Sequence, residues 1–114
     1  MEKDIESSLL LDFYGNLLTE KQKEIMHLYI ECDTSLSEIA SIVGSSRQAV
    51  YDMIKVSEKS LSDLENKLGC VKKYLENRNE LIECVNLLEE LQSQSQSEKL
   101  EKVLEKVQKV LKNQ

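Results

Sequence analysis

The sequence predicts an all-α protein, and three features of its composition carry that prediction. Proline is absent and glycine occurs only three times in 114 residues, so long helices can form without interruption. Aromatic residues make up 4% of the chain and charged residues 32%, which favours solvated helices over a sheet. At this length the chain has room for one compact module with a modest core and a helical extension, which excludes a large buried active site.

Two amphipathic helices are expected in the first 30 residues. In the first, apolar residues recur at helical spacing from Ile5 to Leu17, with acidic residues between them. The Gly-Asn pair at 15–16 should end this helix, since both residues tolerate a left-handed backbone. Thr19 opens the second helix, because it can accept a hydrogen bond from the Gln22 amide while Gln22 reaches back.

The middle of the chain predicts two more helices joined by a tight turn. Ser35 and Glu38 form another capping box, which opens a short helix. Gly44 is positioned to stop that helix, and the serines at 45–46 can cap the next one. This last helix meets no breaker before Gly69, so it should be long.

A helix-turn-helix needs a small residue where its helices cross, a glycine at the turn and apolar residues inside the second helix. Ala40, Gly44, Val50 and either Met53 or Ile54 fill these places at suitable separations. Arginine and glutamine at the start of the second helix suit guanine and adenine edges, or phosphates. The residues that we expect to bind nucleic acid are Ser46, Arg47, Gln48, Tyr51 and Lys55.

The long helix continues into a helical tail. From Val50 to Leu68 apolar positions alternate steps of four and three residues, interrupted only at Ser57, which is a heptad seam. We therefore divide the chain into a helix-turn-helix module without a wing, residues 1–69, and a helical tail, residues 70–114. The Ser-Gln repeat at 93–97 has the composition of a flexible linker within that tail.

The apolar faces of the two tail helices need partners that a small module cannot supply. A symmetric homodimer is our preferred solution, and the competing arrangement folds the tail back on its own chain. The residues that we expect to mediate self-association are Leu61, Leu64, Leu68, Leu75, Ile82, Leu104 and Leu111.

The net charge of −6 lies entirely in residues 1–69, where 13 acids oppose seven bases, while residues 70–114 carry eight of each. Proteins that bind nucleic acid mainly through phosphates usually show a basic surplus instead. The charge therefore favours a protein partner, and the helix-turn-helix spacing favours DNA or RNA. Both remain open at this point.

Several other classes of function are disfavoured. Three cysteines without paired spacing, and His27 as the sole histidine, support neither a disulfide framework nor a metal site. With no glycine-rich phosphate loop and no recognisable catalytic grouping, we expect no enzyme activity and no cofactor. No run is apolar enough for a membrane helix and the charged start is no signal peptide, so we expect a cytoplasmic protein.

Three motifs in order carry a resemblance to known proteins. Residues 18–22 (LTEKQ), 35–40 (SLSEIA) and 46–51 (SRQAVY) resemble region 4 of sigma factors, which reads a promoter element through its recognition helix. Together with the short acidic first helix and the long tail, the chain is more closely similar to the YlxM family of small bacterial proteins. The motifs cover about half of the chain, and the tail resembles that family in length and character.

This resemblance implies a regulatory role in the signal recognition particle protein-targeting pathway, with the GTPase or the RNA of that particle as partner. Where such modules commonly continue Lys-Arg, this chain has Lys55-Val56, so one phosphate-binding cation is missing. A sequence-specific DNA-binding transcriptional regulator and an interaction module without nucleic-acid binding are the alternatives.

Overall fold

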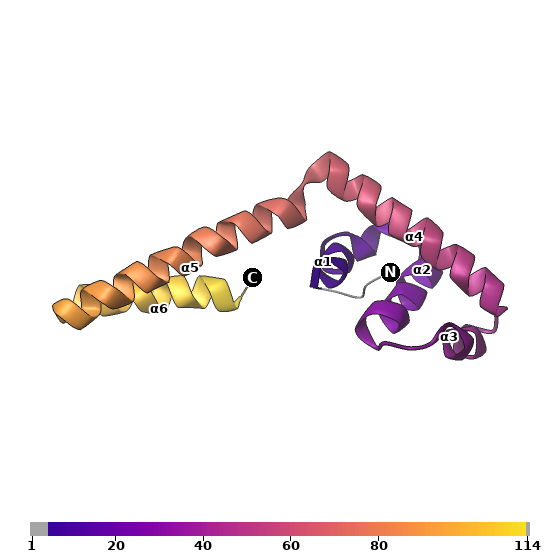
Figure 1. The fold of residues 1–114 in the computed structure, drawn as a ribbon, viewed down its shortest axis with the longest axis horizontal. Coiled ribbons are helices and arrows are strands. Elements are labelled where there is room, and N and C mark those ends of the chain that lie inside the picture. The colour runs from indigo at the N-terminus through magenta and orange to yellow at the C-terminus, as the bar shows by residue number, and fades with distance from the viewer. Residues whose placement is uncertain (1–4, 114) are drawn as a thin grey trace. The chain divides into compact units, whose positions relative to one another are not determined.

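The computed structural model describes residues 5–113, and this range consists of helices and short connections, with no strand (Figure 1). The all-α prediction is confirmed. None of the helices in this range is long and apolar enough to cross a membrane. The elements are α1 (Ile5–Tyr14), the 3-10 turn η1 (Gly15–Leu17), α2 (Glu20–Met26), the π-helical turn η2 (His27–Glu31), α3 (Leu36–Val43), α4 (Arg47–Leu68), α5 (Cys70–Gln94) and α6 (Glu98–Lys112).

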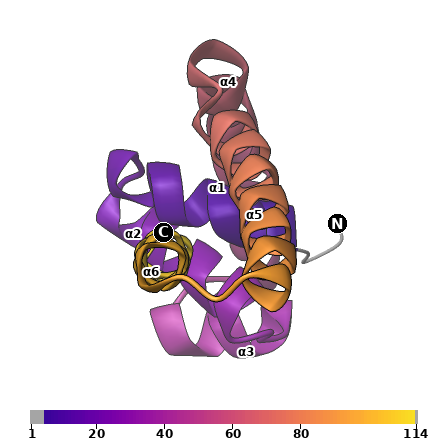
Figure 2. The ribbon, with the colours of Figure 1, turned by 90° about the vertical axis from the view of Figure 1, so that its left-hand side faces the viewer.

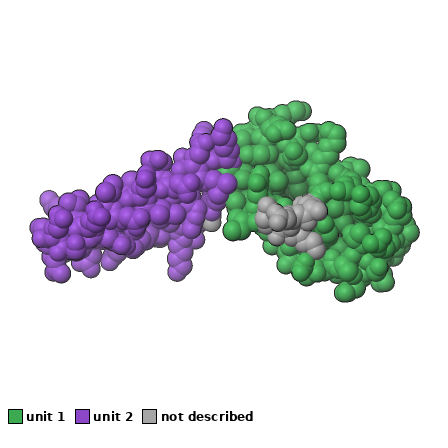
Figure 3. All heavy atoms as spheres, in the orientation of Figure 1, with its two compact units in different colours: residues 1–71 green, residues 72–114 purple. Residues whose placement is uncertain are grey.

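The chain divides into two compact units, residues 1–71 and 72–114 (Figure 3). We call the described parts of these units the module (residues 5–71) and the tail hairpin (residues 72–113). Each is described by itself below.

The core of the module forms around α4. Because α4 lies across α1, α2 and α3, its inward side chains meet apolar residues from all three helices and from η2. The buried apolar residues are Leu11, Tyr14, Ile25, Met26, Ile30, Ile39, Ala40, Val50, Ile54, Leu61 and Val71.

Helix starts in the module follow the local sequence. The Thr19 amide donates to Gln22 Oε1 at 3.0 Å and the Gln22 amide donates to Thr19 Oγ1 at 3.2 Å, which is the expected capping box of α2. Ser35 Oγ accepts from the Glu38 amide at 3.2 Å and caps α3. Each cap supplies a partner for an amide that the helix itself leaves without one.

The end of α1 differs from our expectation. Positive φ angles among the described residues occur only at Asp33, Gly44 and Gly69, so the expected left-handed ending at residues 15–16 is wrong. The chain instead tightens into η1. Gly15 is buried, and a Cβ there would lie 3.3 Å from Leu11 Cδ1, so the glycine serves close packing.

A buried polar cluster holds the first turn of α5 in the module. The Tyr14 hydroxyl donates to Glu65 Oε1 at 2.6 Å and accepts from the Cys70 amide at 3.0 Å. Glu65 Oε1 also accepts from the Val71 amide at 3.0 Å. Burial, and then the hydrogen bond to Glu65, raise the pKa of Tyr14 well above its usual range. Two first-turn amides of α5 thereby gain partners from α1 and α4.

In the tail hairpin, α6 returns antiparallel along α5 (Figures 1 and 2). Arg78 Nη1 donates to the Leu111 carbonyl at 3.3 Å, which joins the two helices. The helix α5 continues to Gln94, two residues into the segment for which we predicted a linker, and Ser97 caps α6 by accepting from the Leu100 amide. No side chain between residues 72 and 113 is fully buried.

Candidate nucleic-acid interface

The turn between α3 and α4 places the start of α4 at the surface. Gly44 adopts φ 70°, and the Ser45 amide donates to the Ala40 carbonyl at 3.0 Å. Ser46 Oγ then accepts from the Ala49 amide at 3.0 Å and caps α4. The remaining first-turn amides and the positive end of the helix dipole stay at this exposed terminus, where an anion is favoured.

Two buried residues fix which face of α4 is available. Val50 and Ile54 point into the core, so residues on the opposite side of the helix must face solvent. Tyr51, for example, is 43% exposed. All five residues predicted to bind nucleic acid are exposed, namely Ser46, Arg47, Gln48, Tyr51 and Lys55.

Some of these side chains already have partners in the chain. Gln48 Nε2 donates to Asp52 Oδ1 at 2.9 Å. Lys55 Nζ lies 3.8 Å from Glu58 Oε1 and 5.4 Å from the centroid of the Tyr51 ring. A ligand that uses the Gln48 amide must therefore displace Asp52, and one that uses the Lys55 ammonium competes with Glu58.

Arg47 differs from these neighbours. Its guanidinium makes no hydrogen bond and no ion pair with any residue between 5 and 113, and it lies at the first position of α4. Because a guanidinium presents five donors and is always charged, it can bind a phosphate or a guanine edge there without breaking an internal contact.

The next turn of α4 presents an apolar residue at the position where the sequence resemblance led us to expect a second cation. Val56 is 56% exposed, and it lines a hollow of about 340 Å³ together with Gln22, Ala49, Asp52 and Met53. This hollow has one acid and no base, so it does not favour an anion.

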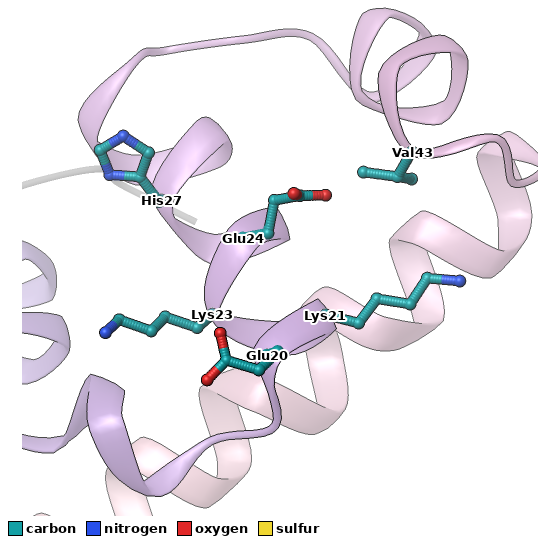
Figure 4. A pocket seen from close by; sticks show the side chains of 6 residues that line it. All are labelled: Glu20, Lys21, Lys23, Glu24, His27 and Val43. Atoms are coloured by element: carbon teal, nitrogen blue, oxygen red, sulfur yellow. The ribbon is translucent and has the colours of Figure 1, made fainter.

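A second hollow, of about 600 Å³, lies between α2, η2 and the end of α3 (Figure 4). Figure 4 shows Lys21 and Lys23 extending away from each other, so they do not converge on one point. Two acids accompany them, and the hollow therefore has no preference for an anion. Its lining residues are Glu20, Lys21, Lys23, Glu24, His27 and Val43.

The sequence predicted an amphipathic helix after Thr19 but did not indicate the hollow beside it. The π-helical turn η2 was not expected; it brings His27 Nε2 to 3.6 Å from Cys32 Sγ, because residues five apart lie on one face of such a turn. Within residues 5–113 no three His, Cys, Asp or Glu side chains come together in a way that could hold a metal ion.

The residues expected to mediate self-association lie in different environments. Leu61 is 2% exposed in the module core, so it cannot contact a second chain while the module is folded, and that part of the expectation is wrong. Leu64 packs against the same core, whereas Leu68 is exposed. On the tail hairpin, Leu75 and Ile82 are partly exposed, and Leu104 and Leu111 are half-buried.

Comparison with known proteins identifies the family. The model of the UPF0122 family, described as "Putative helix-turn-helix protein, YlxM / p13 like", matches residues 1–111. The chain belongs to this family. The UPF0122 protein of Acetivibrio thermocellus is 44% identical over 108 residues, which cover 95% of this chain and 92% of that protein.

Other UPF0122 proteins are similar to this chain over most of their length. The protein of Desulforamulus reducens is 42% identical over 104 residues, covering 91% of this chain and 89% of its own length. The UPF0122 protein of Clostridium kluyveri is 43% identical over 105 residues, which cover 90% of this chain and 93% of that protein. The resemblance to the YlxM family is therefore confirmed, and the match extends to residue 111 in the tail.

Proposed function

We propose that this protein is a non-enzymatic regulatory protein of the cytoplasm that binds nucleic acid through the first turns of α4. The observation that carries the proposal is Arg47: an exposed guanidinium without a partner in residues 5–113, at the positive end of the recognition helix of a helix-turn-helix. Membership of a family described as helix-turn-helix supports it.

The chemistry of the exposed face favours RNA with unpaired bases over a DNA duplex. Tyr51 offers an exposed ring for stacking beside the Lys55 ammonium, and single-stranded bases bind by stacking on such rings. A duplex reader needs several phosphate contacts in addition. Val56 stands where one of those cations is common, so the face has fewer than a duplex requires.

We further propose that the protein acts in the signal recognition particle protein-targeting pathway, with the RNA of that particle as the nucleic acid. Support comes from the similarity of its motifs to the YlxM family and from the family match. The exposed ring and the single free guanidinium suit a looped RNA better than a promoter.

A second candidate function follows from the charge. Residues 1–69 carry all of the net charge of −6, which repels phosphates at long range and attracts basic protein surfaces. In this alternative the module and tail contact the particle GTPase and no nucleic acid is bound.

The test is a binding titration of the full chain at low salt against three labelled ligands: particle RNA, promoter-like duplex DNA and an unrelated duplex. The proposal predicts the tightest binding to particle RNA and a loss of about 10-fold or more in Arg47→Ala. The matched control is Lys67→Ala, which removes an exposed base from the last turn of the same helix and should change little.

Other outcomes select other functions. Tightest binding to promoter-like DNA would indicate a transcriptional regulator. Binding to none of the three, together with co-elution with the particle GTPase, would establish the protein-interaction alternative and overturn the nucleic-acid proposal.

A further inference from the structure

The tail hairpin uses one apolar stripe on each helix to hold itself together. On α6 the half-buried residues recur at i, i+4, i+7 and i+11 from Leu100, and on α5 a similar stripe begins at Tyr74. These two stripes face each other, as the contact from Arg78 to the Leu111 carbonyl indicates. The half-buried residues are Tyr74, Arg78, Leu81, Val85, Leu88 and Gln92 on α5, and Leu100, Leu104, Val107 and Leu111 on α6.

A second apolar stripe on each helix is left uncovered. On α5 it consists of Cys84, Leu87 and Leu91, spaced by three and four residues, and on α6 of Val103 and Val110, spaced by seven. Leu91 is 53% exposed and Val103 is 44% exposed. These spacings put each set on one helix face.

The two uncovered stripes open onto the same side of the hairpin. Leu91 and Val103 both line a hollow of about 430 Å³, together with Leu100 and the serines that flank the connection. We call the five residues of the uncovered stripes the open face. A two-helix hairpin has no third element with which to cover it, so it must stay hydrated or find a partner.

Charges of opposite sign border the open face on its two helices. On α5 the border is acidic, since Glu83 and Glu90 lie four residues before and three after Leu87. On α6 it is basic, since Lys99 and Lys106 lie four before and three after Val103. The exposed border residues are Glu76, Glu80, Glu83 and Glu90 on α5, and Lys99, Lys102, Lys106 and Lys109 on α6.

None of these eight border residues forms an ion pair with another residue between 5 and 113. The acidic and basic borders are therefore both available to a partner. A partner that matches them must present an apolar face with a basic edge opposite α5 and an acidic edge opposite α6.

We propose that the open face is covered by the open face of a second copy of this chain, which forms an antiparallel four-helix bundle. A two-fold axis parallel to the helices puts α5 of one copy against α6 of the other, because each copy presents the same patch. The glutamate border then meets the lysine border on both edges, and the apolar stripes form a shared core.

The first test is the molar mass of the full chain by size-exclusion chromatography with light scattering at about 100 μM, followed by dilution. The proposal predicts twice the mass of the chain. Leu91→Glu should weaken association by about 100-fold or more, since it buries an unpaired charge. Its control is Ile42→Glu, an equally drastic change at an exposed residue of α3, which should leave the dimer intact.

The decisive variants each reverse the charge of one border of the open face. Lys99→Glu/Lys106→Glu makes both borders acidic, and Glu80→Lys/Glu83→Lys makes the α5 border basic, so each variant alone should be a monomer. Mixed in equal amounts they should form a heterodimer, because each acidic border now meets a basic one. Mixing would not restore association if either variant were unfolded. Formation of the heterodimer therefore shows that charge at the interface, and not loss of stability, made each variant a monomer.

Cys84 gives an independent readout within the open face. Its alkylation rate should fall at least several-fold as the protein concentration rises, whereas that of Cys32, exposed on the module, should not change. A monomer at about 100 μM, a dimer that Leu91→Glu leaves intact, or a mixture of reversed variants that stays monomeric would each overturn the proposal.

Discussion

The module and the tail hairpin contain similar apolar side chains but bury them very differently. Eleven apolar residues of the module are buried, whereas no residue between 72 and 113 is. The reason is the number of packed helices: α4 packs against three other helices, whereas the tail hairpin consists of only two helices. Several packed helices can enclose a core, whereas two helices leave part of their apolar side chains exposed.

Truncation of one apolar residue in each region tests this contrast with the largest expected change in stability. Ile39→Ala should lower the free energy of unfolding by about 3 kcal/mol, because Ile39 of α3 is fully buried in the module core and the mutation leaves a cavity. Leu75→Ala, at a partly exposed residue of α5, should cost less than about 1 kcal/mol. Urea denaturation followed by circular dichroism measures both, and equal losses would contradict the contrast.

Tyr14 tests how the first turn of α5 is held in the module. Tyr14→Phe removes the hydroxyl that pairs with Glu65 and the Cys70 amide, so we expect a loss of about 2 kcal/mol from the buried groups left without partners. Amide exchange at Cys70 and Val71 should accelerate in the same variant. Unchanged exchange at these two amides would show that the first turn of α5 does not depend on the cluster.

The same residue predicts a dependence of stability on pH. Burial raises the pKa of Tyr14 in the folded chain above its unfolded value, which is about 10. The folded chain thus holds the proton more tightly, and this contribution is complete below about pH 10 and is lost as the pH rises further. The difference in unfolding free energy between the wild type and Tyr14→Phe should therefore shrink above pH 10, and a constant difference would contradict the assignment.

The smallest expected change in stability comes from a polar residue in the module core. Ser57 is fully buried on α4, and its hydroxyl has no hydrogen-bond partner among the described residues. Replacing a buried hydroxyl that has no partner should raise stability. We predict that Ser57→Ala increases the free energy of unfolding by about 1 kcal/mol, measured in the same urea titrations. A decrease would show that the hydroxyl has a partner in solution.

Features fixed by neighbouring residues could be predicted from the sequence. The capping box at Thr19 and Gln22, the left-handed Gly44 and the end of α4 at Leu68 all follow from short-range chemistry. The exposed face of α4 also follows, since the inward positions of a helix determine the outward ones. These features were enough to identify the fold and the family.

Features that join distant parts of the chain could not be predicted. The heptad seam at Leu61 was assigned to a second chain because its pattern is the same whether the partner is another copy or the module's own core. The hydrogen bond from Tyr14 to Glu65 joins residues 51 positions apart, and no local pattern marks it. The open face of the tail could not be identified from the sequence either, because it requires knowing which apolar stripe of each helix packs inside the hairpin.

The two regions also divide the proposed functions. The module offers Arg47 and an exposed aromatic ring for nucleic acid, and the tail offers the open face for a second copy. A variant of one region should therefore leave the other function in place: Arg47→Ala should remain a dimer, and Leu91→Glu should keep its affinity per chain for RNA.

The most direct test of the nucleic-acid assignment is the affinity of the full chain for particle RNA as a function of salt, for the wild type and Arg47→Ala. The account predicts that the logarithm of the affinity falls linearly with the logarithm of the salt concentration. Arg47→Ala should bind more weakly and with a slope shallower by about one, since one phosphate contact is lost. Identical affinity and slope in the two proteins would contradict the assignment of α4 as the nucleic-acid interface.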